Sequence, residues 1–246
     1  MAWTPIASTY GYSVDSGTVL DAAATLHIEV GDVLCVYTGW MGDTTTIAVA
    51  TSDAAETFSM SAVQMAGTRN GGAIGWVQVG THNAAATVRM TVGAARTKRA
   101  FSVMQFRPDA GDTVTYVAGP GAASASSGSA PTSANISPSG TDLLCFGGSY
   151  NAAGAGTANE QIGDVAADGT QDAGNSLGGW YKLYTSNQTN IHAQSTFGDD
   201  DSWTCHIIAL ESAAGGGGEV SIAAYTTYFA NMRLRNKMHT DDSDLL

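Results

Sequence analysis

The sequence predicts an all-β protein: a two-sheet antiparallel sandwich or jelly roll with a pseudo-twofold internal repeat, followed by a short helical arm at the C-terminus. The first observation is a series of short segments rich in Val, Ile, Thr and aromatic residues and bounded by Gly, Asp or Asn, which is typical of strands. The second is the presence of 30 glycines and the lack of sustained helical periodicity between residues 1 and 212. The third is that similar segments recur in the same order in the two halves of the chain.

The recurrence begins with two segments in which a turn with Gly and Asp precedes an apolar run around Leu-Cys. Cys35 and Cys145 mark these runs and are 110 residues apart, whereas the later matches share an offset of 104 residues. The later matches are Gly75–Val79 with Gly179–Leu183, Thr87–Val92 with Ile191–Thr196, and Phe101–Phe106 with Cys205–Leu210. Four matches in one order predict a duplication, and they place Trp76 and Trp180 at equivalent positions in the core.

One half alone would expose its apolar face, so we expect the two halves to share one core within a single domain of residues 1–212. The segment between the halves is rich in Gly, Ser, Ala and Pro and is expected to be mobile or to lie on the surface. A second long segment, 151–179, is expected to be a loop. The predicted boundaries are half one at about 15–118, the crossover at 119–133, half two at about 134–212, a glycine linker at 213–218 and the arm at 219–246.

Composition and charge restrict the class of protein. Of the 246 residues, 43% are hydrophobic and 13% are charged, which is typical of a folded chain rather than a disordered one. The net charge of −12 repels nucleic acid and anionic membranes, so we expect neither as a partner. The first ten residues lack the basic start and apolar run of a signal peptide, and no run of 18 apolar residues predicts a membrane span.

The three cysteines, Cys35, Cys145 and Cys205, lie among apolar neighbours in predicted strands. An odd number of cysteines in a long chain does not indicate a disulfide framework, and no CxxC or HxxxH spacing indicates a zinc site. We therefore predict buried free thiols.

The C-terminal arm is predicted to be a short amphipathic helix on a tether. Gly215–Gly218 form the hinge, and an apolar stripe at helical spacing follows. The stripe and the basic residues after it are the predicted assembly contact: Ile222, Tyr225, Phe229, Met232, Arg233 and Arg235. Two alternatives stay open, docking on another subunit and packing back on the chain's own domain.

A search for catalytic chemistry finds no nucleophile elbow, no P-loop, no dinucleotide-binding glycine motif and no HExxH motif. The five histidines are scattered, and the five glutamates show no pairing that suggests a glycosidase. The sequence therefore predicts no catalytic residue, no metal site and no cofactor. A pair of carboxylates brought together only by folding keeps a polysaccharide hydrolase as an alternative.

One candidate ligand site lies in the turn before the last predicted strand, where three carboxylates stand beside a tryptophan: Asp199, Asp200, Asp201 and Trp203. Clustered carboxylates can bind calcium, although the spacing matches no EF-hand and a solvated turn is the simpler interpretation. Trp203 is the best candidate for an exposed aromatic ring that stacks on a sugar.

These segments together resemble a two-half β-sandwich module found in phage virion proteins and in some bacterial surface proteins. The resemblance covers about residues 15–212 and rests on strands and turns: the strand ending at Trp40, then Thr51–Phe58, Arg99–Phe106, the Ser/Gly/Pro crossover, Thr141–Leu144 and Trp203–Leu210. Ala55-Glu56 replace the Gly-Asn that is usual before the turn aromatic. Such modules act as capsid decoration proteins, head fibres and tail adhesins, and the pattern supplies no catalytic residues.

The resemblance implies a non-enzymatic structural protein on the surface of a virion, either a capsid decoration protein or an accessory fibre subunit. Its expected partners are other capsid or tail subunits, and a homo-oligomer is expected. A carbohydrate-binding adhesin of a phage tail, which binds glycans on the host surface, is the first alternative, and exposed tryptophans would distinguish it.

Overall fold

The computed structural model describes residues 3–53, 55–151, 153, 157–174 and 176–214, and these residues form strands, turns and loops without a helix. None of them forms a helix that is long and apolar enough to cross a membrane. The strands are β1 (Trp3–Ser13), β2 (Gly17–Asp21), β3 (Leu26–Ile28), β4 (Val33–Met41), β5 (Ile47–Thr51), β6 (Ser59–Met60), β7 (Gln64–Ala66), β8 (Asn70–Gln78), β9 (Asn83–Ala86), β10 (Val88–Arg96), β11 (Arg99–Pro108), β12 (Thr113–Ala125), β13 (Leu143–Asn151), β14 (Thr157–Ile162), β15 (Val165–Ala166), β16 (Gly169–Ala173), β17 (Leu177–Tyr184), β18 (Ala193–Phe197) and β19 (Trp203–Ala213). The prediction of an all-β protein with antiparallel sheets is confirmed.

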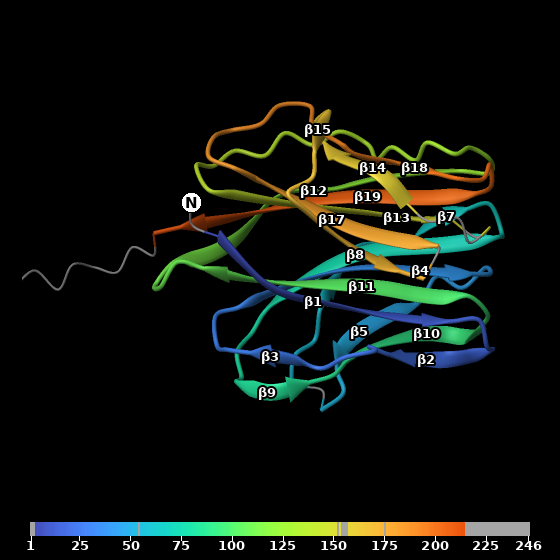
Figure 1. The fold of residues 1–246 in the computed structure, drawn as a ribbon, viewed down its shortest axis with the longest axis horizontal. Coiled ribbons are helices and arrows are strands. Elements are labelled where there is room, and N and C mark those ends of the chain that lie inside the picture. The colour runs from blue at the N-terminus through green and yellow to red at the C-terminus, as the bar shows by residue number, and fades with distance from the viewer. Residues whose placement is uncertain (1–2, 54, 152, 154–156, 175, 215–246) are drawn as a thin grey trace, which may run out of the picture. The chain divides into compact units, whose positions relative to one another are not determined.

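Two large antiparallel sheets form the centre of the molecule. The first central sheet has the order β1-β11-β4-β8-β6, with β7 also paired to β8. The second central sheet has the order β12-β19-β13-β17-β16. Smaller sheets lie outside them: β2-β10-β5 and β3-β9 beside the first, and β15-β14-β18 beside the second, so that the strands stack in four layers (Figure 1).

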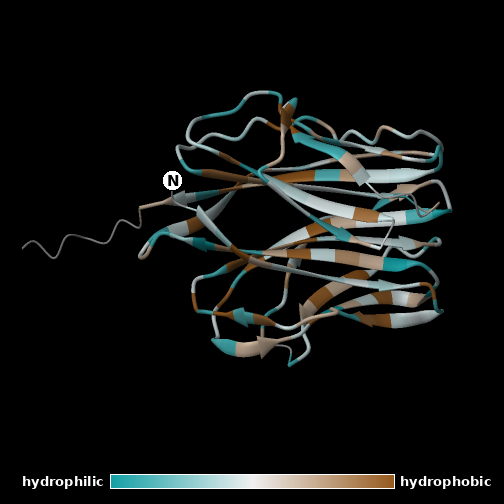
Figure 2. Cartoon of the chain, in the orientation of Figure 1, coloured by the Kyte–Doolittle hydropathy of each residue, from teal (hydrophilic) through white to brown (hydrophobic). Residues whose placement is uncertain are grey.

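Three hydrophobic cores separate the four layers, and hydrophobic segments occur on strands throughout the stack (Figure 2). The middle core joins the two central sheets and contains Tyr37, Phe106, Phe146 and Tyr150. A second core lies between the first central sheet and the outer strands β2, β3, β5, β9 and β10, where Trp40 and Met90 are buried. A third core lies between the second central sheet and β14 and β18, and the indole of Trp180 is buried there.

The prediction of two sheets around one core is wrong, because each half of the chain is itself a sandwich. Val33–Trp40, Arg99–Phe106, Leu143–Asn151 and Thr204–Leu210 are buried at every position. Strands covered on both faces carry apolar residues on both faces, so their segments are largely apolar, with buried polar residues such as Ser102 and Gln105 among them. A two-layer sandwich would instead alternate apolar and polar residues along each strand.

The two central sheets approach closely because glycine faces a large ring on each side. A Cβ placed on Gly39 of β4 would lie 2.2 Å from Tyr150, and one on Gly148 of β13 would lie 2.3 Å from Tyr37. The Tyr37 hydroxyl donates a hydrogen bond to the carbonyl oxygen of Thr204 at 3.0 Å. The middle core is therefore a fitted interface with a buried polar contact.

The predicted equivalence of the two tryptophans is wrong at the level of single residues. Trp76 lies across from Cys35 and packs against the middle core, whereas Trp180 lies across from Gly147 and faces the outer layer. The Trp180 indole Nε1 donates to the Gln161 carbonyl oxygen at 3.1 Å. β8 and β17 nevertheless hold the same place in the strand order of their sheets.

The connection between the halves also differs from the prediction. The low-complexity segment 119–133 lies mostly at the surface, as one of the two predicted alternatives has it, but it is not the connection: its first residues continue β12, which pairs with β19, and its last residues run beside β18. The amide of Ser133 donates to the Ala193 carbonyl oxygen at 2.9 Å, for example. The sandwiches are joined instead by the turn after β11, where the Asp112 amide donates to the Asp109 carbonyl oxygen at 3.1 Å.

The segment 151–179 is not a plain loop, because it contains β14, β15 and β16. β14 and β16 are short and mostly polar, and β15 has only two exposed residues, so none of them shows the apolar alternation that predicts a strand. The cysteine prediction is confirmed: Cys35, Cys145 and Cys205 are free and buried.

Candidate functional site

The predicted assembly contact lies outside the described residues. This applies to all six of its residues, Ile222, Tyr225, Phe229, Met232, Arg233 and Arg235, and to the glycine hinge before them. The contact stays a prediction.

Among the described residues, the structure does not gather the carboxylates of the candidate ligand site before the last strand into a cluster of possible metal ligands, and Asp201 is engaged in internal contacts. Asp201 accepts a hydrogen bond from the Ser202 amide at 2.7 Å and from the Arg69 guanidinium at 3.2 Å. Arg69 belongs to the first sandwich, so this ion pair links the two sandwiches at the surface. Asp199 and Asp200 are exposed. Trp203 is half-buried against the outer core, and a Cβ on Gly128 would lie 2.9 Å from its Nε1, so the loop holds the indole in place.

A groove opens where the edges of the two central sheets meet. Its volume is about 320 Å³, and it is lined by Met60 and Trp76 from the first sheet and by Tyr116, Pro120 and Ile208 from the second. Tyr116 is 42% exposed, and Trp76 is half-buried. The groove is therefore open, is of a size suited to a small ligand, and is bordered by two aromatic rings and by the hydroxyl groups of Ser59 and Ser61.

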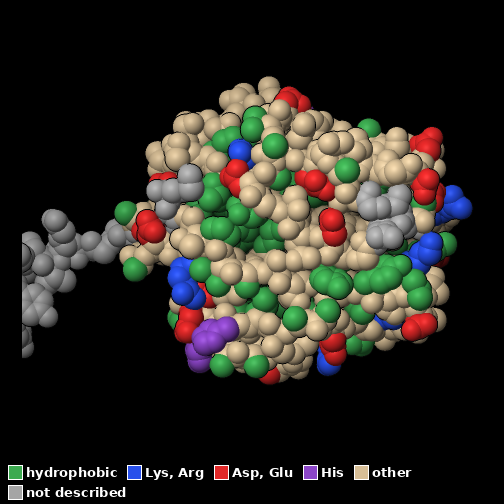
Figure 3. All heavy atoms as spheres, in the orientation of Figure 1, with side chains coloured by type: hydrophobic (Ala, Val, Ile, Leu, Met, Phe, Trp, Pro, Cys, Tyr) green, Lys and Arg blue, Asp and Glu red, His purple; other side chains and the backbone are tan. Residues whose placement is uncertain are grey.

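A second groove, of about 260 Å³, opens at the opposite edge of the same interface. It lies between β1 and β11 of the first central sheet and β16 and β17 of the second, with Tyr181 in its wall. Figure 3 shows hydrophobic side chains gathered where this edge opens. The Tyr181 ring meets that of Phe106 edge to face, with the ring centroids 4.9 Å apart.

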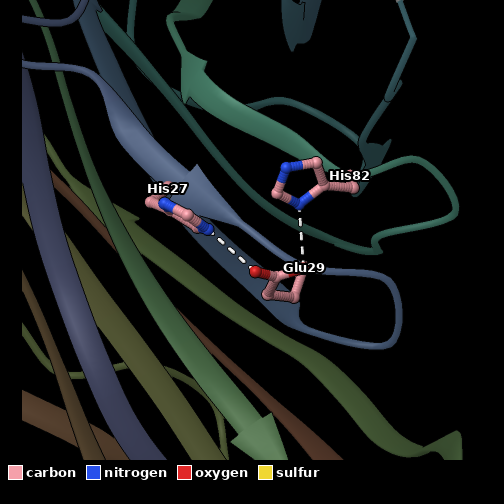
Figure 4. Close-up of side chains that lie close together, drawn as sticks. All are labelled: His27, Glu29 and His82. Atoms are coloured by element: carbon pink, nitrogen blue, oxygen red, sulfur yellow. Dashed lines mark hydrogen bonds and ion pairs between the residues drawn. The ribbon is translucent and has the colours of Figure 1, made fainter.

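A cluster of two histidines and one glutamate lies on the surface over β3 and β9 (Figures 3 and 4). His27 and Glu29 are two residues apart on an extended segment, so their side chains share one face. β3 pairs with β9 through Ile28 and Asn83, which brings His82 beside Glu29. His27 Nε2 lies 2.8 Å from Glu29 Oε1, and His82 Nδ1 lies 2.8 Å from Glu29 Oε2.

Two buried carboxylates fix the backbone on either side of this cluster. Glu56 Oε1 accepts hydrogen bonds from the amides of Gly80 and Thr81, at 2.8 and 2.7 Å, and so positions the turn that carries His82. Asp32 Oδ2 accepts the Glu29 amide at 2.9 Å. Burial acts to raise the pKa of Asp32, but hydrogen bonds from Arg107, the Glu29 amide and Gln105 outweigh it and lower the pKa below its ordinary value.

Hydrogen bonds from His27 and then His82 lower the pKa of Glu29, so this carboxylate is ionised at neutral pH. Sequence reasoning missed the cluster because it treated the histidines as scattered and the glutamates as unpaired. The alternation of His27 and Glu29 between buried Leu26 and Ile28 was a usable signal for two of the three residues. His82 could not be added without the register of β3 and β9.

The third cavity bears on the hydrolase alternative. It has a volume of about 240 Å³ and is lined by Asp32, Arg107, Asp109 and Asp112. Arg107 forms a two-pronged ion pair with Asp32, at 2.7 and 2.9 Å, and Ser212 donates to Asp112 at 2.7 Å. A general acid needs a raised pKa, whereas the pKa of Asp32 is lowered, so Asp32 suits a structural ion pair better than acid catalysis.

Comparisons with known proteins name no relative. No protein-family model matches the chain, and no curated protein matches it. A solved structure with some likeness is the crystal structure of a conserved protein of unknown function from Pseudomonas aeruginosa PAO1, which is 11% identical, with a TM-score of 0.23. That match covers 85% of this chain and 100% of the other, and at such a TM-score it bears on neither fold nor function.

Proposed function

We propose that this chain is a non-enzymatic structural protein of a virion, displayed on the particle surface as a capsid decoration protein or an accessory fibre subunit. The observation that carries the proposal is the common strand order of the two central sheets, β1-β11-β4-β8-β6 and β12-β19-β13-β17-β16. The virion modules that the sequence resembles also consist of two related halves, although they were expected to form one two-sheet sandwich.

The proposed duplication rests on register as well as on strand order. In the first sheet, β4 pairs with β11 on one side and β8 on the other. In the second sheet, β13 pairs in the same way with β19, which corresponds to β11, and with β17, which corresponds to β8. Gly39 and Gly148 correspond at an offset of 109, since each faces an aromatic ring of the opposite sheet. The predicted match of Cys35 with Cys145 is therefore one residue out of register, because Cys35 lies in the middle core and Cys145 in the outer one. The repeat is therefore proposed as two sandwiches, related by a pseudo-twofold axis through the middle core.

The proposed anchor is the C-terminal arm, through contacts with other capsid or tail subunits or with further copies of the chain. Its apolar stripe is too short to be a stable isolated helix in water, so it needs a surface on which to fold. Arg233 and Arg235 add local positive charge to a chain with a net charge of −12, which suits an acidic neighbour.

The test is association with particles from the source organism. Antibodies against the β domain should label purified virions in immuno-electron microscopy, and the chain should be found in them by mass spectrometry. A variant lacking residues 215–246 should be lost from the particles. A matched control variant, Asp241→Asn with Asp242→Asn and Asp244→Asn, keeps the apolar stripe and should be retained. Particles that contain none of the protein would refute the proposal.

A second candidate function is glycan binding by a tail adhesin, and the groove beside Trp76 and Tyr116 favours it. Aromatic faces stack on the apolar faces of sugar rings, and the nearby Ser59 and Ser61 supply hydroxyl groups. A glycan array should then show binding that Tyr116→Ala reduces at least tenfold. Tyr10→Ala changes another exposed tyrosine, 39% exposed and outside the groove lining, and should leave binding intact.

A further inference from the structure

The geometry points to a binding site for one divalent transition-metal ion at His27, Glu29 and His82. The possible ligand atoms, one from each residue, all lie within 4.8 Å of one another. Figure 4 shows both imidazole rings directed toward the carboxylate that lies between them. This inference is independent of the proposed virion role.

The arrangement is one that a metal ion can enter with small side-chain movements. Ligand nitrogens and oxygens lie about 2.0–2.1 Å from a bound zinc ion, which puts tetrahedral ligands about 3.3 Å from one another. Both His–Glu contacts are already at 2.8 Å. The side chains of His27, Glu29 and His82 are 60%, 43% and 51% exposed, so rotation of the rings meets little steric resistance.

The hydrogen bonds of the cluster do not block the metal, because the ion would replace them. A neutral imidazole can carry its proton on either ring nitrogen, so the nitrogen that faces Glu29 can offer its lone pair instead. The carboxylate of Glu29 supplies the oxygen ligand and the negative charge that favour a dication. The carboxylate would then hold the ion between the two rings.

The donor set selects the class of metal. Two imidazoles and one carboxylate suit zinc, nickel, copper or ferrous iron, whereas calcium and magnesium prefer oxygen ligands throughout. Three protein ligands leave at least one position for water or for a group from another molecule. The net charge of −12 adds a general attraction for cations.

The backbone holds the ligands where they are needed, as a metal site requires. Glu56 fixes the turn before His82 through two amide hydrogen bonds, and Asp32 fixes the amide of Glu29. Both carboxylates are buried, at 6% and 1% exposure. The ion would join β3 to the turn before β9, two segments that share only a short ladder with a register shift.

Isothermal titration calorimetry with zinc chloride on the full chain tests the site. The wild type should bind one ion per chain, and His27→Ala, His82→Ala and Glu29→Gln should each weaken binding at least tenfold. His192→Ala is the matched control, since His192 also lies near a carboxylate, 3.4 Å from Asp164. His239→Ala tests the histidine outside the described residues, and both controls should bind as the wild type does.

A second readout separates a specific site from weak surface binding. Zinc should raise the melting temperature of the wild type and not that of His82→Ala, while calcium at the same concentration should raise neither. Circular dichroism of each variant without metal should match the wild type, because the three side chains are exposed. The inference fails if the wild type binds no zinc, if His192→Ala or His239→Ala abolishes binding, or if calcium matches zinc.

Discussion

The ring of Tyr37 lies against the bare backbone of Gly148, so close that a Cβ at that position would fall 2.3 Å from the ring. Tyr37 belongs to the first sandwich and Gly148 to the second. The reverse pair is also present, because Tyr150 of the second sandwich lies against Gly39 of the first in the same way. The two sandwiches can therefore pack this closely only because Gly39 and Gly148 have no side chain.

We expect Gly148→Ala to destabilise the protein by about 1–3 kcal/mol, because an added methyl group in a packed interface forces backbone and ring shifts. Chemical denaturation followed by tryptophan fluorescence measures the change. Gly80→Ala is the matched control: its Cβ would meet Glu56 at 3.7 Å, an ordinary contact, and the free energy of unfolding should stay within about 0.5 kcal/mol. Equal effects of the two variants would contradict a close-fitting interface.

His206 should make the stability depend on pH. It is buried in the middle of the protein, with Nδ1 3.3 Å from the Tyr37 hydroxyl, and burial lowers its pKa from 6.5 to about 3. Below about pH 6.5 the imidazole of His206 is therefore protonated in the unfolded chain, whereas in the folded chain it stays neutral down to about pH 3. The protein therefore keeps its full stability above about pH 6.5 and loses stability as the pH falls from 6.5 toward 3, by up to about 1.4 kcal/mol per pH unit.

The measurement is the free energy of unfolding between pH 4 and pH 8 for the wild type and for His206→Gln, which carries no titrating ring. On acidification the wild type should lose more stability than His206→Gln, because both proteins have the same carboxylates and only the wild type has the buried imidazole. Parallel curves for wild type and His206→Gln would contradict the assignment.

The three thiols should be unreactive in the native protein. Burial raises the pKa of Cys145 to about 12 and those of Cys35 and Cys205 still further, so almost no thiolate is present at neutral pH. Titration with a chromogenic disulfide reagent should find few reactive thiols in buffer and three in denaturant. Rapid reaction of even one thiol in the native state would show that a core opens.

Removal of residues 215–246 should leave the β domain folded with little change in melting temperature. The last strand that the structure describes ends at Ala213, and residues 1–213 form one compact unit with three cores of their own. Differential scanning calorimetry of the truncated and full chains checks this. Unfolding or aggregation of the truncated chain would mean that the arm covers part of the domain, for example a sheet edge, and would contradict its role as an anchor.

The sequence was informative where a pattern is local. The segments around Cys35 and Cys145 and those around Phe101 and Cys205 are strands, and their order recurs. The central strands are also largely apolar along their length, which is typical of strands buried on both faces, but polar residues such as Ser102 and Gln105 interrupt this pattern and make it hard to distinguish from that of a two-layer sandwich.

What the sequence could not supply depends on register and on contacts between distant segments. Trp76 and Trp180 look equivalent along the chain, yet pairing with Cys35 in one sheet and Gly147 in the other turns them to different faces. The same limit applies to the metal site, because His82 reaches Glu29 only through a strand pair and a turn held by Glu56. Side-chain alternation has a period of two, so a small shift in pairing changes which residues meet.

The turn at Asp109–Asp112 is the covalent link between two sandwiches that each enclose a core of their own. A protein with such a joint can be divided there and still contain all of its packing surfaces. Two separate peptides, cut between Ala110 and Gly111, would each keep the strands of one sandwich and meet through the rings of Tyr37 and Tyr150. The pair could then serve as a split reporter, in which fusion partners brought together by the two peptides regain activity only when both are present.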